Sequence, residues 1–338
     1  MTTTDQKPGP AALLDLGTSF WAAKVLLTAV EIDLFSLLAR GPLDAAGIAE
    51  RLGLHPRAVP DFLGALRAEG LLVEQDGEYR NSAAADIYLD KAKPSYVGGF
   101  LTMVNWQYHG WGKLGDLLRT GRMQNERAAD FASFYANPEV LARFMAAMDG
   151  ASRAIGPALA HAVDWSEHAS VVDLGGARGN LAAELAKAHP HLAAGCFDLP
   201  PIEPLFVEHM ERLKLTGRVR FHGGDFFTDE LPPAEAYVVG HVMHDWDAEH
   251  NRLLARRAFE ALPPGGSLMV YDAMIDPERP ETARNHLLSL NMQLLTAGGA
   301  EYPVRDYLSW LREAGFTDVS ATPLTASDTL VRGRKPVR

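Results

Sequence analysis

Cysteine is nearly absent from this chain: Cys196 is the only one among 338 residues. A single cysteine cannot form an internal disulfide, which excludes a disulfide-stabilised secreted scaffold and leads us to expect a cytoplasmic location. Basic residues are also in deficit, since 32 Lys and Arg stand against 43 Asp and Glu and the net charge is −11. We expect no nucleic-acid partner, because binding a polyanion needs a local basic patch that the sequence does not show.

Long apolar runs are lacking as well. The polar stretch 1–10 has no apolar signal core, and no run of the roughly 20 apolar residues that a membrane span requires is apparent. We therefore expect no membrane partner. The length of 338 residues suits about two domains, and a hydrophobic content of 47% supplies enough side chains for sizeable cores.

The first quarter of the chain combines helical periodicity with a hairpin signal. Apolar residues recur every three or four positions between Ala11 and Leu38, which predicts one or two amphipathic helices. Two shorter helices are expected over 44–54 and 55–70, ending near glycines. Residues 71–81 then predict a β-hairpin that turns at Asp76-Gly77. Helix, turn, helix and wing together predict a winged-helix architecture.

A winged helix raises the alternative of a DNA-binding regulator whose second domain senses a ligand. The second short helix, where a recognition helix would lie, carries only Arg57 and Arg67 among mostly apolar residues. Reading a DNA groove needs several basic and amide side chains on an exposed face. We favour a helix that packs in a core or a subunit interface, and the regulator is the remote alternative.

The stretch 171–180 reads V-V-D-L-G-G-A-R-G-N, which predicts a buried strand, a tight glycine turn and the start of a helix. Such a turn brings backbone N–H groups close to a ligand. It is not a dinucleotide fingerprint, because Ala177 and Asn180 occupy the second and third glycine positions, and no phosphate-binding G-K-S/T follows. A glycine turn beside Asp173 suits a nucleoside that carries an amino group and no phosphate, and S-adenosylmethionine is such a ligand.

Strands and helices continue to alternate after the glycine turn, which predicts a parallel, doubly wound (Rossmann-like) α/β sheet. Ligands of such sheets lie at the carboxyl ends of the strands. Polar residues stand at or just after five successive predicted strand ends, namely Asp173, Asp198, Asp225, His244 and Asp272. Five polar residues at successive strand ends indicate a ligand site more strongly than any one of them.

Two of these acids suit a nucleoside. Asp198 lies one strand beyond the glycine turn, where a carboxylate can accept hydrogen bonds from both ribose hydroxyls, or it could cap a helix before Pro200. Asp225 could take the adenine amino group while Phe226 offers an apolar face, or it could be an ordinary turn residue.

His244 is the candidate base. Its unperturbed pKa of about 6.5 allows an imidazole at a strand end to remove a proton near neutral pH. Asp272 and Glu301 could hold its other ring nitrogen, and such a partner fixes the tautomer and the ring orientation. A lone histidine is more often structural, so the placement and the two acids carry this interpretation.

Aromatic and methionine side chains are frequent between residues 96 and 148. They are typical of an ordinary core, and the alternative is a wall against a flat ligand. The residues expected to converge on an acceptor are Trp106, Tyr108, Met148, Asn291 and Met292.

The motifs occur in a recognisable order: the glycine turn, Asp198-Leu-Pro, Gly224-Asp-Phe-Phe, His244-Asp-Trp and Gly298-Gly-Ala-Glu301, behind a winged helix. In this order they resemble the class I S-adenosylmethionine-dependent small-molecule O-methyltransferases, typified by plant caffeate and bacterial antibiotic-pathway enzymes. The resemblance covers nearly the whole chain. It implies a winged-helix dimerisation domain at 11–95, a helical linker and substrate lid at 96–160, a methyltransferase domain at 161–338, and a homodimer.

The resemblance also implies residue roles. The family's base matches His244, and its two acidic partners match Asp272 and Glu301, with no metal. The positions expected to bind S-adenosylmethionine are Ser152, Asp173, Gly175, Gly176, Asp198, Leu199, Asp225, Phe226 and His241. Three positions depart from the usual pattern: Ala177 replaces a glycine, Gly240-His241 stands where a basic residue is common, and Tyr302 replaces an arginine.

The expected activity is methylation of a phenolic hydroxyl of a small aromatic metabolite, with His244 as general base. One alternative is C-methylation of an α-keto acid or another acidic carbon, assisted by a metal ion on His241 and His244, with Asp245. N-methylation is a further alternative, because an amine could lose its proton to the same base.

Overall fold

The computed structural model describes residues 9–93, 95–124, 137, 141–142, 144–145, 148 and 155–337. The chain divides into two compact units, Met1–Trp106 and Gln107–Arg338. The three-part division of the chain at residues 95 and 160 stays a prediction.

The first unit has the winged-helix elements that the sequence predicts. Its helices are α1 (Ala11–Thr18), α2 (Phe20–Glu31), α3 (Leu34–Leu38), α4 (Ala45–Leu52), α5 (Val59–Ala68) and α6 (Ala83–Tyr88), and its strands β1 (Leu43–Asp44), β2 (Leu72–Gln75) and β3 (Glu78–Asn81) form a sheet in the order β1-β3-β2. The hairpin turns at Asp76 and Gly77 with φ of 54° and 82°, as a tight hairpin turn requires. Strand β1, which pairs with β3, was not predicted.

Helix α5 packs on the core of this unit. Its residues Val59, Leu63 and Leu66 are buried, and Arg67 forms an ion pair with Glu74 of strand β2. The apolar face of this helix therefore serves the core, as its sequence indicates.

Helices α1 and α2 contradict one sequence-based expectation. The stretch Ala11–Glu31 is 21 residues long and its most apolar window has a mean hydropathy of 1.4, enough to cross a membrane by length and composition. The expectation that no such stretch exists is therefore wrong, although core helices pass the same test. Large apolar side chains are exposed along it, namely Leu13, Leu14, Leu16, Phe20 and Trp21. An exposed apolar patch of this kind marks a site of association.

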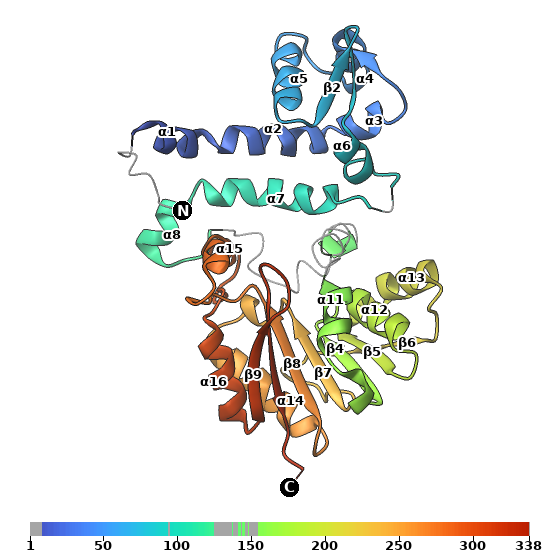
Figure 1. The fold of residues 1–338 in the computed structure, drawn as a ribbon, viewed down its shortest axis with the longest axis vertical. Coiled ribbons are helices and arrows are strands. Elements are labelled where there is room, and N and C mark those ends of the chain that lie inside the picture. The colour runs from blue at the N-terminus through green and yellow to red at the C-terminus, as the bar shows by residue number, and fades with distance from the viewer. Residues whose placement is uncertain are drawn as a thin grey trace, which may run out of the picture. The chain divides into compact units, whose positions relative to one another are not determined.

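The second unit is built on a seven-stranded sheet (Figure 1). Its strands are β4 (Ser170–Leu174), β5 (Ala193–Asp198), β6 (Val219–Gly223), β7 (Ala236–Gly240), β8 (Ser267–Asp272), β9 (Thr317–Pro323) and β10 (Thr329–Arg334), in the order β6-β5-β4-β7-β8-β10-β9. The first five are parallel, as predicted, whereas β10 is antiparallel to both β8 and β9. A short connection between β9 and β10 permits only antiparallel pairing.

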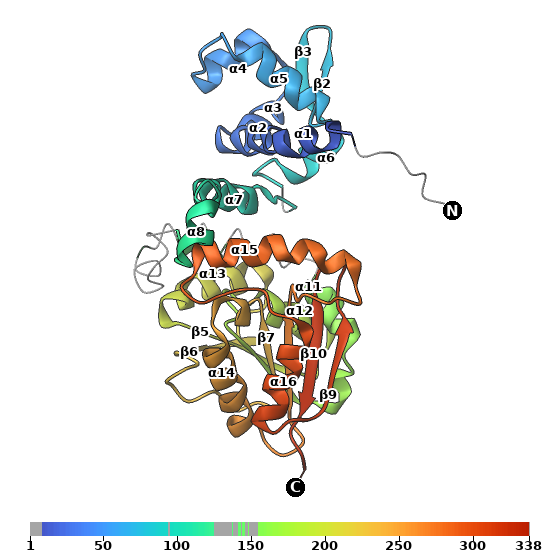
Figure 2. The same ribbon diagram turned by 90° about the vertical axis from the view of Figure 1, so that its left-hand side faces the viewer.

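Helices cover both faces of this sheet (Figures 1 and 2). The covering helices are α11 (Ile155–Ala162), α12 (Asn180–Ala188), α13 (Glu203–Leu213), α14 (Ala248–Ala261) and α16 (Val304–Ala314). Helix α15 (Asn285–Leu295) lies across the edge of the sheet at which the parallel strands end. Helices α7 (Gly98–Trp111) and α8 (Leu114–Thr120) come before these helices in the chain. Val171 packs in the core with α11, α12 and α13, and its neighbour Val172 packs in the core with α14 and α16. The alternation of strand side chains thus gives three layers.

The strand order places a switch point at β4. From β4 the chain runs first to β5 on one side and later to β7 on the other side. Connections that leave in opposite directions open a crevice at the carboxyl ends of the two central strands, which is where such sheets bind ligands.

Candidate active site

The glycine turn after β4 lies tightly against its neighbours. Gly175 has a φ of 74° and its N–H donates to Phe197 O at 2.8 Å, at the end of β5. A Cβ on Gly176 would lie 2.6 Å from Asp173 Oδ2 and 2.8 Å from Cys196 Sγ, closer than real side chains approach. Glycine is therefore required there. Ala177 has a φ of 51°, so it adopts the left-handed conformation that the usual glycine would take more easily.

Asp198 is oriented by this turn. Its Oδ2 accepts the N–H of Ala177 at 2.8 Å and its Oδ1 accepts the N–H of Leu199 at 2.7 Å. Burial raises its pKa to about 6, although both hydrogen bonds favour the charged form. Each oxygen keeps a lone pair that a ribose hydroxyl could use. The alternative role as a helix cap is not observed, because Leu199 stands at the cap of the next turn, which has no side-chain cap.

Asp173 lies under the turn. Burial, and then the charge of Asp198, raise its pKa to about 7. A buried carboxylate of this kind is stabilised by an incoming cation. The pair therefore suits a ligand with hydroxyl groups and a positively charged amino group.

Asp225 and Phe226 lie just past β6. Asp225 Oδ1 accepts the N–H of Phe227 at 2.8 Å. This contact is that of a turn residue, which is the alternative to the adenine-binding role. The half-buried ring of Phe226 packs edge-on against Trp246 and lies 3.7 Å from the Cβ position of Gly175. The ring is thus next to the glycine turn.

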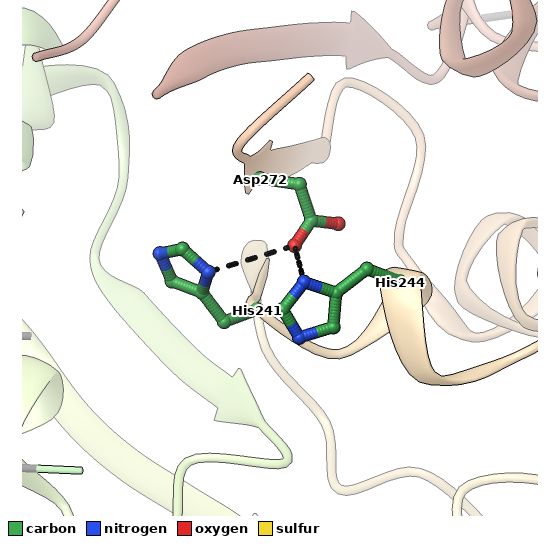
Figure 3. A group of neighbouring side chains, drawn as sticks. All are labelled: His241, His244 and Asp272. Atoms are coloured by element: carbon green, nitrogen blue, oxygen red, sulfur yellow. Dashed lines mark ion pairs between the residues drawn. The ribbon is translucent and has the colours of Figure 1, made fainter. Parts of the chain in front are cut away.

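His244 is brought together with both predicted acids. It sits in a single 3-10 turn, Met243–Asp245, which Asn251 Nδ2 holds by a 2.9 Å hydrogen bond to Met243 O. His244 Nδ1 lies 2.7 Å from Glu301 Oε1. The same nitrogen lies 3.4 Å from Asp272 Oδ1 (Figure 3). Burial lowers the pKa of the imidazole, but Glu301 and Asp272 outweigh it and raise the pKa to about 10.

Residues that the sequence did not single out hold these acids in place. Tyr307 Oη donates to Asp272 Oδ2 at 3.0 Å, and Ser289 Oγ accepts the N–H of Glu301 at 3.2 Å. A Cβ on Gly299 would lie 2.3 Å from His244 O. The Gly-Gly segment therefore packs directly on the turn that carries His244, and nothing local in the sequence marks Tyr307 or Ser289.

His241 follows β7 in an unusual conformation. Its φ is 51°, and its Nε2 lies 3.1 Å from Asp328 Oδ1. Its Nδ1 lies 3.8 Å from Asp272 Oδ1 (Figure 3). A Cβ on Gly240 would lie 1.9 Å from the Tyr271 ring, so glycine is required before it. Left-handed backbone at a non-glycine residue is maintained only where its surroundings enforce it.

The metal alternative has a geometric counterpart here. His241, His244 and Asp272 each offer one ligand atom, and these three atoms lie within 4.8 Å of one another. Asp245 Oδ1 lies 3.9 Å from His244 Nε2. The 2.7 Å separation of His244 and Glu301 is that of a charge-assisted hydrogen bond. Because a carboxylate already serves each imidazole, the geometry favours a hydrogen-bonded cluster.

Of the residues expected to bind the acceptor, Asn291 and Met292 lie on one helix, α15. Asn291 Oδ1 accepts the indole N–H of Trp111 at 2.9 Å. Met292 is buried on the same helix, α15. Tyr108 and Met148 are half-buried, Trp106 belongs to the other unit and is 47% exposed, and Ser152 lies outside the described residues.

The glycine turn lies at the switch point of the sheet, and Asp198 lies at the end of the next strand. Together they are typical of an α/β enzyme that binds a nucleoside. A profile of the O-methyltransferase domain matches residues 111–317, and one of the O-methyltransferase dimerisation domain matches residues 14–91. The chain belongs to the S-adenosylmethionine-dependent O-methyltransferase family, and S-adenosylmethionine is its methyl donor.

Individual relatives agree over almost the full length. The tetracenomycin polyketide synthesis 8-O-methyl transferase of Streptomyces glaucescens is 49% identical, over 99% of this chain and 100% of its own. An N,N-dimethyltransferase of Streptomyces rimosus is 43% identical over 94% of each chain. The structure of human N-acetylserotonin methyltransferase with S-adenosylmethionine matches with a TM-score of 0.88 at 28% identity, covering 99% and 100% of the two chains.

Proposed function

We propose that this enzyme methylates a hydroxyl group of a small aromatic secondary metabolite. The observation that carries the proposal is the contact of His244 Nδ1 with Glu301 Oε1 at 2.7 Å, next to Asp272. A ring nitrogen held in this way leaves Nε2 to face an acceptor. The 49% identity to a polyketide 8-O-methyl transferase supports an aromatic acceptor.

The glycine turn and the acids around it would hold the methyl donor. The residues proposed to bind it are Ser152, Asp173, Gly175, Gly176, Asp198, Leu199, Asp225, Phe226 and His241. Asp173 would face the amino group and Asp198 the ribose. The donor supplies a methyl group that a sulfonium makes electrophilic, so positioning of the acceptor oxygen carries most of the acceleration.

His244 would hold the acceptor's proton, and Glu301 and Asp272 would stabilise the imidazolium. Removal of a proton by a positioned base contributes roughly a hundred- to ten-thousand-fold. The acceptor would contact Trp106, Tyr108, Met148, Asn291 and Met292.

The working assembly would be a cytoplasmic homodimer without nucleic-acid or membrane partners. The match of residues 14–91 to a dimerisation domain supports the dimer, and the exposed apolar side chains of α1 and α2 provide a surface for it.

A transfer assay tests the proposed activity. Protein incubated with methyl-labelled S-adenosylmethionine and a panel of phenols, aromatic amines and α-keto acids should label a phenolic oxygen, located by mass spectrometry and NMR. Methylation of an amine would instead support the second candidate, which the 43% identity to an N,N-dimethyltransferase favours. Chelator-sensitive methylation of a carbon atom would support the metal-assisted alternative.

A further inference from the structure

Helix α13 packs one buried face against the start of α12. Phe206, His209 and Met210 are the buried residues of α13, and their spacing of three and four positions places them on one face of the helix. Gly179 lies against this face, since a Cβ there would come within 2.7 Å of the Phe206 ring and 3.3 Å of Met210 Cε. Gly179 precedes α12 with a φ of 84°, which glycine adopts without strain. The end of the glycine turn is therefore packed closely on α13.

His209 is the polar residue of this face, and only 4% of it is exposed. Arg212 Nη2 lies 2.6 Å from its Nδ1, and its Nε2 lies 2.5 Å from Oδ1 of Asn180, the first residue of α12. A guanidinium can only donate hydrogen bonds, so Nδ1 accepts one and carries no proton. The ring proton is then on Nε2, which donates it to Asn180 Oδ1. The two partners thus select one tautomer of a neutral imidazole.

The surroundings of the ring disfavour a second proton. Burial is the main cause that lowers the pKa of His209 to about 3, and it acts together with the positive charges of Arg178, Arg212 and Lys187. These three cations come from the glycine turn, α13 and α12. A buried imidazolium among them would be strongly destabilised. His209 is therefore no acid or base near neutral pH, and the contact that remains for it is the one with Asn180.

This contact closes a ring of connections between two parts of the expected donor site. On one side, the N–H of Ala177 in the glycine turn donates to Asp198 Oδ2 at 2.8 Å. On the other side, the segment 199–202 leads from Asp198 directly to α13, and His209 links α13 back to Asn180. A shift of α13 against α12 would therefore move the glycine turn and Asp198 relative to each other.

We propose that His209 is a positioning residue for the methyl donor, because it holds the glycine turn and Asp198 in the relative position that S-adenosylmethionine requires. It acts through Asn180 rather than by contact with the donor. The proposal rests on the proposed donor-binding roles of the turn and of Asp198, and it is independent of the nature of the acceptor. A site whose groups are fixed in advance binds more tightly, because less conformational freedom is lost on binding.

Calorimetry with S-adenosylhomocysteine tests the proposal on the whole enzyme and needs no acceptor. His209→Leu keeps a side chain of similar size and removes the Nε2–H donor. The Kd should rise roughly five- to tenfold, the effect of about one lost neutral hydrogen bond. His209→Gln places an amide donor near the same point and should restore most of the affinity. A wild-type Kd in folded His209→Leu protein would overturn the proposal.

His189 provides a matched control at the other end of α12. It directly follows the last residue of the helix, and its Nε2 lies 2.9 Å from Ala160 O, so a similar contact is made away from the turn. His189→Leu should lower the thermal midpoint and leave the Kd unchanged, whereas His209→Leu should change both. If both variants lose thermal stability and neither changes the Kd, His209 serves only the stability of the fold.

The tautomer of His209 can be read in the wild-type enzyme, whether or not His209→Leu folds. Ring NMR of protein labelled with 15N-histidine, assigned with H209Q, should show a neutral His209 that is protonated on Nε2 between about pH 5 and about pH 8. A proton on Nδ1, or the gain of a second ring proton within this range, would overturn the proposal.

The proposed donor site and the role of His209 fail in different ways. An unchanged Kd in folded Asp198→Asn protein would remove the donor site, and the inference about His209 with it. A Kd that rises in Asp198→Asn but not in His209→Leu would remove only the positioning role.

Discussion

His244 Nδ1 lies 2.7 Å from Glu301 Oε1, although the two residues are 57 positions apart in the chain. The contact depends on two supports: Ser289, which accepts the N–H of Glu301, and Gly299, which packs on the carbonyl of His244. The imidazole and the carboxylate therefore belong to one structural unit rather than to two loops that meet.

Removal of the imidazole should separate chemistry from cofactor binding. We expect His244→Asn to lower kcat by roughly 10²- to 10⁴-fold, the usual contribution of a positioned proton-transfer group. The affinity for S-adenosylhomocysteine, measured by calorimetry, should stay near that of the wild type. Full turnover in this variant would exclude His244 from the mechanism.

The packing of Gly299 predicts a sharp difference between adjacent glycines. Gly299→Ala places a Cβ 2.3 Å from His244 O and should displace Glu301, whereas Gly298→Ala meets Asp247 Cβ only at 3.1 Å. We expect the first variant to lose activity by roughly tenfold or more, since small displacements of a catalytic group are costly. The second is the control. Equal activities of the two variants would contradict the positioning role of Gly299.

Asp198 should determine cofactor affinity. Its carboxylate is fixed by the N–H groups of Ala177 and Leu199, with lone pairs left for a ligand. Asp198→Asn replaces one acceptor oxygen and removes a charge-assisted hydrogen bond worth about 1.5–3 kcal/mol, so the Kd for S-adenosylhomocysteine should rise roughly 10- to 100-fold. A thermal melt checks that the variant is folded, and an unchanged Kd in folded protein would exclude the ribose role.

Asp173 should make the ligand-free protein less stable at high pH. Burial, then the charge of Asp198, raise its pKa to about 7, from about 3.9 in an unfolded chain. A raised acid pKa means that the folded state binds the proton more tightly, so its stabilising effect is lost as pH rises from about 4 to 7. Asp173→Asn should raise the denaturation midpoint at pH 8 more than at pH 5. The same gain at both values would contradict this account.

Much of the site could be predicted because its motifs are local. The residue types alone predict the glycine turn. A parallel sheet brings the carboxyl ends of β4, β5, β7 and β8 to one edge. The sequence therefore predicts that Asp198, His244 and Asp272 lie at one edge of the sheet, and the structure brings His244 and Asp272 to within 3.4 Å of each other.

The remaining contacts depend on pairings that no local pattern encodes. Tyr307 reaches Asp272 from α16, and Asp328 reaches His241 from the connection before β10. Their positions follow from the insertion of β10 between β8 and β9, which is a long-range choice. Side-chain spacing along the chain carries no information about such partners.

The structure of the enzyme with bound S-adenosylhomocysteine tests the central claim most directly. The account predicts the ribose hydroxyls on Asp198, the amino group near Asp173 and the sulfur on the side of the glycine turn that faces His244 Nε2. A nucleoside bound away from the ends of β4 and β5, or with its sulfur turned from His244, would contradict the account.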